Sequence, residues 1–291
     1  MEKRGDQLME EGEKSLSKFS LFNFSSDKSE KARDKFTQAA TQYKACGEFA
    51  KAGHAYKRAA DMSQKSNNEW DVATDLEEAA RSYVKCGDTS KAVQMYAQVA
   101  ELHEKAQRYS KAAKTCISLG EIAHEKEAMQ WLEKAARFYE LQGSRVTADE
   151  VVLKMADVKA RCGDYDGARE VYDRLARAAL DDRVSRGGAR KLFFTALLAE
   201  LATFTSDSIQ EDVAVLQERF DEYQGLDTQF NELTREHMLI RAVIEAIQEE
   251  SVEKMDEAVS EYDNICPLDE MRGKMLLRAK TALRQCVENL R

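Results

Sequence analysis

The chain has 291 residues, of which 43% are hydrophobic and 33% charged, so it is long enough to bury a sizeable core. One proline, 13 glycines and few stretches that alternate as strands do predict a nearly all-helical protein. A net charge of −9 argues against general binding to nucleic acid. Six dispersed cysteines without a CxxC pair and a highly charged start predict reduced thiols in a cytoplasmic protein. The longest apolar stretch, residues 192–204, is shorter than the roughly 20 residues of a membrane span.

The first unusual feature along the chain is the stretch KFSLFNFSSDKSE, residues 18–30, where large apolar side chains stand among serines. These side chains are Phe19, Leu21, Phe22 and Phe24. Their spacing is too irregular for a core helix, which leaves two interpretations. Either they pack back on the first helices or stay disordered, or they meet a lipid surface. At roughly 1.5–3 kcal/mol for each buried side chain, four partly inserted ones would contribute about 4–6 kcal/mol, a weak and reversible attachment.

A repeat of about 40 residues follows this stretch. Segments 39–61 and 79–101 share tyrosine, glycine and alanine at matching places, and parts of the pattern return after a further 36 and then 40 residues. The matching residues are Tyr43, Gly47, Ala52, Tyr56 and Ala60; Tyr83, Gly87, Ala92, Tyr96 and Ala100; Ala128, Leu132 and Ala136; and Gly163, Ala168, Tyr172 and Ala176. The glycines suit left-handed helix ends, and the acid after each (Glu48, Asp88, Asp164) can cap the next helix or interact favourably with the dipole at its N-terminus. Small alanines let antiparallel helices approach closely, with tyrosines filling the groove between them.

This pattern predicts an all-α fold, a tetratricopeptide-like right-handed α-solenoid of antiparallel helix hairpins with a C-terminal helical bundle. The period exceeds the roughly 34 residues of the tetratricopeptide repeat, and it fades at Gly187 and Gly188. We therefore divide the chain into residues 1–186, with the N-terminal helix, the phenylalanine-rich stretch and the hairpin array, and residues 187–291, the helical cap. Cysteines in the Cys-Gly-acid triplets would lie on different hairpins, so they do not indicate a metal site.

Charge is distributed unevenly along the chain. Residues 207–261 contain 16 acidic and 4 basic residues, a net charge of −12, whereas residues 1–206 contain 33 acidic and 34 basic residues. The count is compatible with a solvated acidic face or with a surface that meets a basic partner. The four histidines form no HExxH pattern, and no glycine-rich phosphate loop is present. We therefore predict no catalytic residue, no metal and no cofactor, and a function in binding.

Three stretches together resemble the soluble NSF attachment proteins (SNAPs), in their alpha/beta, Sec-seventeen-like form. They are the phenylalanine-rich stretch, the hairpin array with QRYSKAAKTCISLGEIAHEK (107–126), and the run 243–291 that ends in a penultimate leucine. The resemblance implies a cytoplasmic, peripheral-membrane adaptor that links assembled SNARE complexes, syntaxin-like and others, to the AAA ATPase NSF for SNARE disassembly in vesicular transport. It also implies that several copies coat one bundle, and that the phenylalanine-rich loop inserts into the membrane.

Binding residues are also implied by the resemblance, position by position. Basic family positions that contact the acidic SNARE bundle correspond to Arg108 and Lys114, with Lys111 close by, and a further family lysine corresponds to Lys154. Another basic family position corresponds to Glu150, a departure that puts that turn in doubt. Positive charge there could instead come from Arg183, Arg186, Arg190 and Lys191. For each of these cations a solvated surface position is the alternative.

Acidic residues near the C-terminus match family positions that meet basic patches on NSF. Glu245 and Glu249 correspond to such acids, with Glu250 and Glu253 adjacent, and Leu290 matches a leucine needed to stimulate ATP hydrolysis. The rival interpretation is a tetratricopeptide-like peptide-binding scaffold or co-chaperone without a membrane role. It would require a compact basic clamp for a terminal carboxylate, which the sequence does not contain, and it leaves the phenylalanines unexplained.

Overall fold

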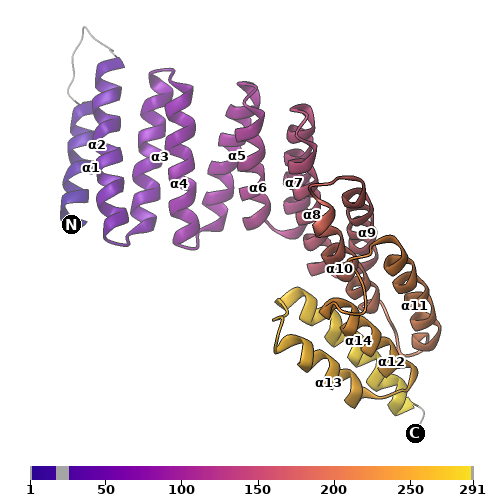
Figure 1. Ribbon diagram of the computed structural model, residues 1–291. Helices are drawn as coiled ribbons and strands as arrows, with labels where there is room; N and C mark the ends of the chain where they lie inside the picture. The colour runs from indigo at the N-terminus through magenta and orange to yellow at the C-terminus, as the bar shows by residue number, and fades with distance from the viewer. Residues whose placement is uncertain (1, 18–25, 290–291) are drawn as a thin grey trace. The chain divides into compact units, whose positions relative to one another are not determined.

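The computed structural model describes residues 2–17 and 26–289, and every regular element in this part of the chain is a helix (Figure 1). The chain divides into two compact units, Met1–Val151 and Val152–Arg291. The predicted all-α fold of antiparallel helix hairpins is confirmed. The sequence-based boundary at 186/187 marks where the repeat fades. It does not coincide with the division into units, and it stays a prediction about the end of the hairpin array.

Helices of the first unit pack in chain order, each against the next, as Figure 1 shows for α1 to α7. The tyrosines and alanines of the predicted repeat are buried between them: Tyr43 and Tyr83 are each 4% exposed, and Ala52 and Ala92 are fully buried. The helices are α1 (Glu2–Ser17), α2 (Ser26–Ala45), α3 (Phe49–Lys65), α4 (Glu69–Lys85), α5 (Thr89–Lys105), α6 (Tyr109–Ile122), α7 (Glu125–Leu141) and α8 (Arg145–Arg161), of which α8 spans the boundary between the units.

One three-residue turn joins most of these helices. Its middle residue has a positive φ and its third residue is the N-cap of the next helix; the middle residues are Gly47, Asn67, Gly87, Gln107, Gly143 and Gly163. The N–H of the third residue donates to the carbonyl five positions earlier, as from Asp88 to Tyr83 at 3.0 Å. This is a Schellman helix end, which favours glycine because other residues are strained at positive φ. The structural unit is therefore one helix and one turn, about half the repeat seen in the sequence.

Capping by the acid after each glycine is confirmed at two of the three predicted positions. The Asp88 carboxylate accepts from the backbone N–H of Lys91 at 3.1 Å, and that of Asp164 accepts from Gly167 at 3.0 Å. Glu48 forms no side-chain cap hydrogen bond, so at α3 the acid acts only through its charge at the helix N-terminus. Asp and Asn are preferred at the N-cap, whereas the longer Glu side chain is not among the preferred residues.

The single 36-residue spacing in the repeat has a local cause. Helix α6 has 14 residues instead of 17, and only two residues, Ala123 and His124, join it to α7. Both residues are extended, with ψ of 161° and 154°, so this link has no left-handed residue. Three fewer helical residues and one fewer turn residue together shorten the 40-residue repeat by four.

Helix α1 packs on α2 through two glycines that face aromatic rings. A Cβ at Gly12 would lie 2.6 Å from Cε1 of Phe36, and one at Gly5 would lie 2.7 Å from Cε1 of Tyr43. Only a residue without a side chain lets the rings lie this close. The Tyr43 hydroxyl also donates to Asp6 at 2.7 Å. The two helices that flank residues 18–25 are therefore fixed to each other.

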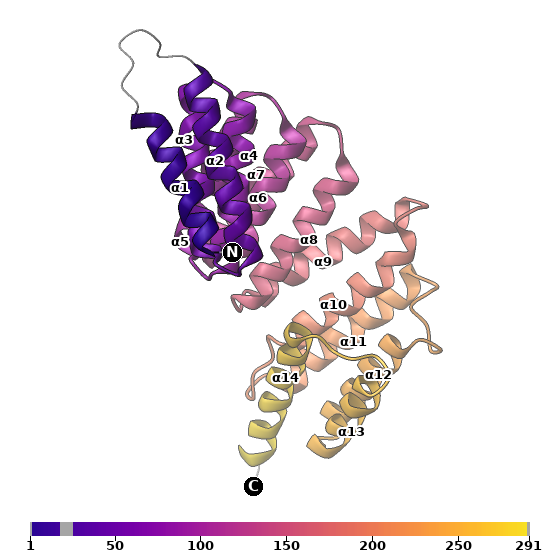
Figure 2. The ribbon, with the colours of Figure 1, turned by 90° about the vertical axis from the view of Figure 1, so that its left-hand side faces the viewer.

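The second unit is built around α10, which contacts α9, α11, α12 and α14. Residues 193–201 of this helix are all buried, so the longest apolar stretch of the sequence is a core helix. Figure 2 gives a second view of α12, α13 and α14, of which α12 and α13 pack together. The elements are α9 (Tyr165–Asp181), η1 (Arg186–Gly188), α10 (Ala189–Leu201), α11 (Ile209–Leu226), α12 (Arg235–Gln248), α13 (Val252–Asp263) and α14 (Glu270–Asn289). Among the described residues, no helix is both long enough and apolar enough to cross a membrane.

Candidate functional site

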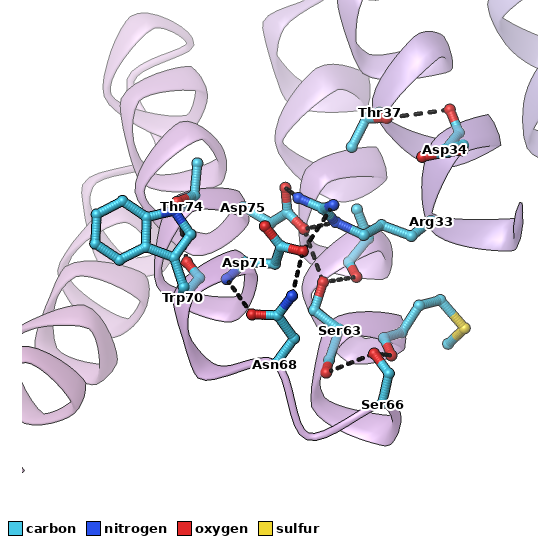
Figure 3. A network of polar contacts seen from close by, with 12 residues as sticks. Arg33, Asp34, Thr37, Ser63, Ser66, Asn68, Trp70, Asp71, Thr74 and Asp75 are labelled. Atoms are coloured by element: carbon cyan, nitrogen blue, oxygen red, sulfur yellow. Dashed lines mark hydrogen bonds and ion pairs between the residues drawn. The ribbon is translucent and has the colours of Figure 1, made fainter. Parts of the chain in front are cut away.

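A buried ion pair fixes the start of α4, as Figure 3 shows. The Arg33 guanidinium of α2 donates to Asp75 of α4 at 2.7 Å and lies 2.9 Å from Asp71. The Ser63 hydroxyl of α3 donates to Asp75 at 3.1 Å, and Asp75 is 3% exposed. Asn68 caps α4 by accepting from the Asp71 N–H at 3.3 Å. Side chains from three helices therefore hold the first turns of α4 in place, a network that the sequence analysis did not predict.

Trp70 lies on this first turn and points away from the Arg33 network (Figure 3). Its indole is 49% exposed, which is unusual for so large an apolar side chain. Two cations from the start of α6 lie at the indole: the Lys111 Nζ is 3.7 Å and the Arg108 Cζ 4.9 Å from the ring centroid. Sequence reasoning missed Trp70 because its partners lie about 40 residues later, one hairpin further on. No pattern in the sequence specifies which side chains meet across these helices, so no signal there pointed to this contact.

The start of α6 has a cation where four other helices have a capping side chain. Asn68, Asp88, Asp164 and Ser251 each accept a backbone N–H at their N-caps, whereas Arg108 at the α6 N-cap forms no side-chain cap hydrogen bond, as is also the case at the starts of α3, α7, α10, α11 and α12. The first turn of α6 contains no acid. A helix N-terminus carries partial positive charge, so cations there reduce helix stability.

Positive charge continues along α6 from this start. Lys111 and Lys114 are exposed and follow Arg108 at intervals of three residues, which places all three on one side of the helix. Many other cations of this unit pair with acids, as Lys44 does with Glu78 at 2.7 Å. In the part of the chain that the structure describes, none of the three α6 cations has an acidic partner within 4.0 Å. The structure therefore brings three of the predicted SNARE-contact residues together as uncompensated charge, here called the α6 stripe.

His103 is buried near the α6 stripe, with 5% of its surface exposed. Burial lowers the pKa of its imidazole, and the positive charges of Lys111 and Arg108 lower it further, against a smaller opposing effect of Glu77. The ring is therefore held neutral. Its Nδ1 has no hydrogen-bond partner among the described residues.

The predicted acidic residues gather at the opposite kind of helix end. Glu245 lies in the last turn of α12, Glu249 is its C-cap, Glu250 follows with φ of 54°, and Glu253 lies in the first turn of α13. All four are exposed, and we call them the α12–α13 acidic turn. Because a helix C-terminus carries partial negative charge, Glu245 and Glu249 are placed unfavourably. Two cations partly offset them: Arg241 lies 3.7 Å from Glu245, and Lys254 pairs with Glu249.

Remaining predicted residues lie elsewhere. Lys154 and Glu150 are both exposed on α8. Arg190 is half-buried at the start of α10 and lies 3.7 Å from Glu236 of α12, so the Glu236 carboxylate partly neutralises its charge. The four apolar side chains Phe19, Leu21, Phe22 and Phe24, as well as Leu290, lie outside the described residues.

The described side chains were searched for groups that could bind a metal ion. Residues 2–17 and 26–289 contain no group of three or more His, Cys, Asp or Glu side chains able to hold a metal ion. The cysteines of the three Cys-Gly-acid triplets, Cys46, Cys86 and Cys162, are exposed at three different helix ends.

Comparison with known proteins decides the family. The family model "Soluble NSF attachment protein, SNAP" matches residues 3–284. The chain belongs to this family. The alpha-soluble NSF attachment protein of Mus musculus is 29% identical over 271 residues, which cover 91% of this chain and 88% of the mouse protein. That of Vitis vinifera is 27% identical, with 97% and 94% covered, and a probable vesicular-fusion protein sec17 homolog of Neurospora crassa is 27% identical, with 94% of each covered.

Among solved structures, the apo form of RapI aligns with 98% of this SNAP-family chain and 99% of its own, at 12% identity and a TM-score of 0.42. The family match and the named relatives confirm the resemblance to the alpha/beta, Sec17-like SNAPs. Because SNAP-family members are adaptors and not enzymes, membership also confirms that this protein is a non-enzymatic adaptor.

Proposed function

We propose that this SNAP-family protein binds assembled SNARE complexes through the α6 stripe and recruits NSF through the α12–α13 acidic turn. NSF then disassembles the SNARE complex during vesicular transport. The observation that carries the proposal is that both surfaces place charge where it weakens a helix: cations at the start of α6 and acids at the end of α12. Natural sequences break such local rules mainly where function requires it.

On the SNARE side, the proposed partner is an acidic four-helix coiled coil. Each exposed cation contributes little to affinity, about 0.2–1 kcal/mol, but a row of uncompensated cations steers an anionic rod and raises the association rate. Among the described residues, no acid lies within 4.0 Å of Arg108, Lys111 or Lys114 to compete with the partner. Lys154 and Arg190 remain candidate contacts in the other unit.

On the NSF side, the proposed partner is a basic surface on the N domains of the ATPase. Glu245, Glu249, Glu250 and Glu253 are exposed within one turn and its two flanking helix ends, so they present several carboxylates to one basic patch. Leu290 is proposed to act in stimulating ATP hydrolysis once NSF is bound.

At the membrane, Phe19, Leu21, Phe22 and Phe24 are proposed to insert next to the SNARE anchors of a cytoplasmic, peripherally bound adaptor. The packing of α1 on α2 supports this proposal, because it keeps the two ends of segment 18–25 on one fixed helix pair. Weak insertion by one copy becomes firm when several copies occupy one bundle. Phe22→Ser with Phe24→Ser should reduce activity on liposome-anchored complexes and leave binding to soluble complexes unchanged. An equal loss in both assays would show that this segment serves folding instead.

The test of the adaptor function is a pull-down with assembled SNARE complex and with individual SNAREs, each with and without NSF. Wild type should capture assembled complex in preference to single SNAREs. It should retain NSF only when the assembled complex is present. Glu245→Lys with Glu249→Lys should lose NSF and keep the SNARE complex. The control is Glu218→Lys with Asp221→Lys, which makes the same charge change at exposed sites on α11. Equal NSF retention by the two double variants would remove the acidic turn from the proposal.

A further inference from the structure

We infer that Trp70 is a SNARE-binding residue that acts together with Arg108 and Lys111. We call these three residues the Trp70 cluster. The inference rests on the proposed function and extends it to a residue that neither the sequence pattern nor the family resemblance supplied. The partner it fits is the acidic helical bundle proposed above, at a place where carboxylates flank an apolar side chain.

The first support is the exposure of the indole and the contacts it makes. About half of the Trp70 surface is open to water, while Lys111 lies at 3.7 Å and Arg108 at 4.9 Å from the ring centroid. Neither cation pairs with an acid among the described residues. A cation–π contact is weak at an exposed site and becomes stronger as water is excluded. The cluster is therefore expected to strengthen when a partner covers it.

The second support is the rigidity of the first turn of α4. Trp70 lies between Asn68, which caps the helix, and Asp71, which pairs with Arg33 at 2.9 Å (Figure 3). The indole is thus carried by a turn that is already held by side chains of α2 and by its own cap. A residue that is ordered before binding loses little conformational entropy when the complex forms.

The third support is the chemistry of protein interfaces. Binding energy concentrates in a few residues, among which tryptophan and arginine are enriched, surrounded by contacts that exclude water. In the Trp70 cluster the indole offers apolar area, and the two cations at its face offer charge for carboxylates. An assembled acidic coiled coil supplies both complements on its surface, because its exposed acids lie beside long side chains whose apolar stems can cover the indole.

The experiment titrates the full chain with soluble assembled SNARE complex that lacks its membrane anchors, at several salt concentrations. The variants are Trp70→Ala and Trp70→Phe, and the control is Leu141→Ala, which removes another exposed apolar side chain of the same unit, 61% exposed at the end of α7. Trp70→Ala should weaken binding about tenfold, which corresponds to about 1.4 kcal/mol. Trp70→Phe should weaken it about threefold, since phenylalanine keeps a weaker aromatic face. Leu141→Ala should bind as wild type does.

Salt dependence separates the roles within the cluster. Trp70→Ala removes no charge, so the slope of log Kd against log salt should stay the same while the affinity falls. Arg108→Gln with Lys111→Gln should flatten that slope. Folding is monitored by the urea midpoint from the fluorescence of Trp131, the only other tryptophan of the chain. If Trp70→Ala does not fold, the affinity of Trp70→Phe is compared with that of wild type instead.

Each outcome decides one claim. Wild-type affinity in both Trp70 variants, with wild type binding the complex, would overturn the inference and leave the proposed function standing. If Trp70→Ala binds anionic lipid vesicles more weakly than wild type does but keeps wild-type affinity for the SNARE complex, the inference is also overturned. If wild type itself fails to bind assembled SNARE complex, the proposed function fails and the inference with it.

Discussion

Replacing Arg108 by asparagine should stabilise the first unit while weakening SNARE binding. Asparagine at this position would supply the missing N-cap acceptor of α6, as Asn68 does for α4. A good N-cap is worth about 1 kcal/mol. Loss of the Arg108 contact with Trp70 at 4.9 Å removes about 0.5 kcal/mol at this exposed site. The net expectation is a gain of about 0.5 kcal/mol over wild type.

Arg108→Ala is the matched comparison, because it removes the same cation and the same contact without adding an acceptor. The two variants should therefore differ by about 1 kcal/mol. Both tryptophans, Trp70 and Trp131, lie in the first unit, so tryptophan fluorescence in urea follows the unfolding of this unit. With a urea dependence of about 1–3 kcal/mol per molar, the asparagine midpoint should exceed the alanine midpoint by about 0.3–1 M.

Binding should change in the other direction. Both variants should bind assembled SNARE complex about two- to fivefold more weakly than wild type, as expected for one exposed cation. Equal urea midpoints for the two variants would refute the claim that the α6 N-cap is left unsatisfied. Unchanged SNARE binding in both would refute the claim that Arg108 occupies this position for function.

Further predictions concern stability. Asp75→Ala should cost about 2–3 kcal/mol, because it removes the acceptor to which the half-buried Arg33 and the buried Ser63 donate; a loss below 1 kcal/mol in urea unfolding would contradict this. Gly12→Ala should raise hydrogen exchange throughout α1, since a Cβ there meets the aromatic ring of α2, whereas Gly225→Ala, with open space around it, should not; equal exchange in both would count against the ring contact. The pKa of the buried His103 is lowered in the folded chain. Below about pH 6.5 the unfolded chain therefore binds a proton at this imidazole more readily than the folded chain does. The unfolding free energy from tryptophan fluorescence should therefore fall from pH 7.5 to 5.5, less so in His103→Gln, and an identical pH dependence in the variant would be inconsistent with this.

Much of the fold follows from local rules that act on neighbouring residues. Gly47, Gly87 and Gly163 predicted helix ends because glycine tolerates the left-handed conformation, and all three lie there. The turns at Asn67, Gln107 and Gly143 were missed, because Asn and Gln adopt the left-handed conformation less often than glycine and Gly143 lies outside the repeated pattern. The sequence alone therefore revealed three turns of the array and a repeat twice as long as the structural unit.

The sites show the same division between local and tertiary information. Clustering of the acids around Glu249 follows from their closeness in the sequence. The Trp70 contact and the Arg33–Asp75 pair join residues about 40 positions apart, and no periodicity specifies which side chains meet across helices. The unfavourable placement of Arg108 also became visible only once the other N-caps could be compared with it.

The most direct test of the account is the affinity for assembled SNARE complex as a function of salt, for wild type and for Arg108→Glu with Lys114→Glu. The control is Lys126→Glu with Arg137→Glu, which reverses two exposed cations on α7. The account predicts that the α6 variant binds weakly at low salt with a flattened salt dependence, while the control stays close to wild type. Wild-type affinity of the α6 variant at low salt would contradict the claim that misplaced helix-end charge marks the SNARE-binding surface.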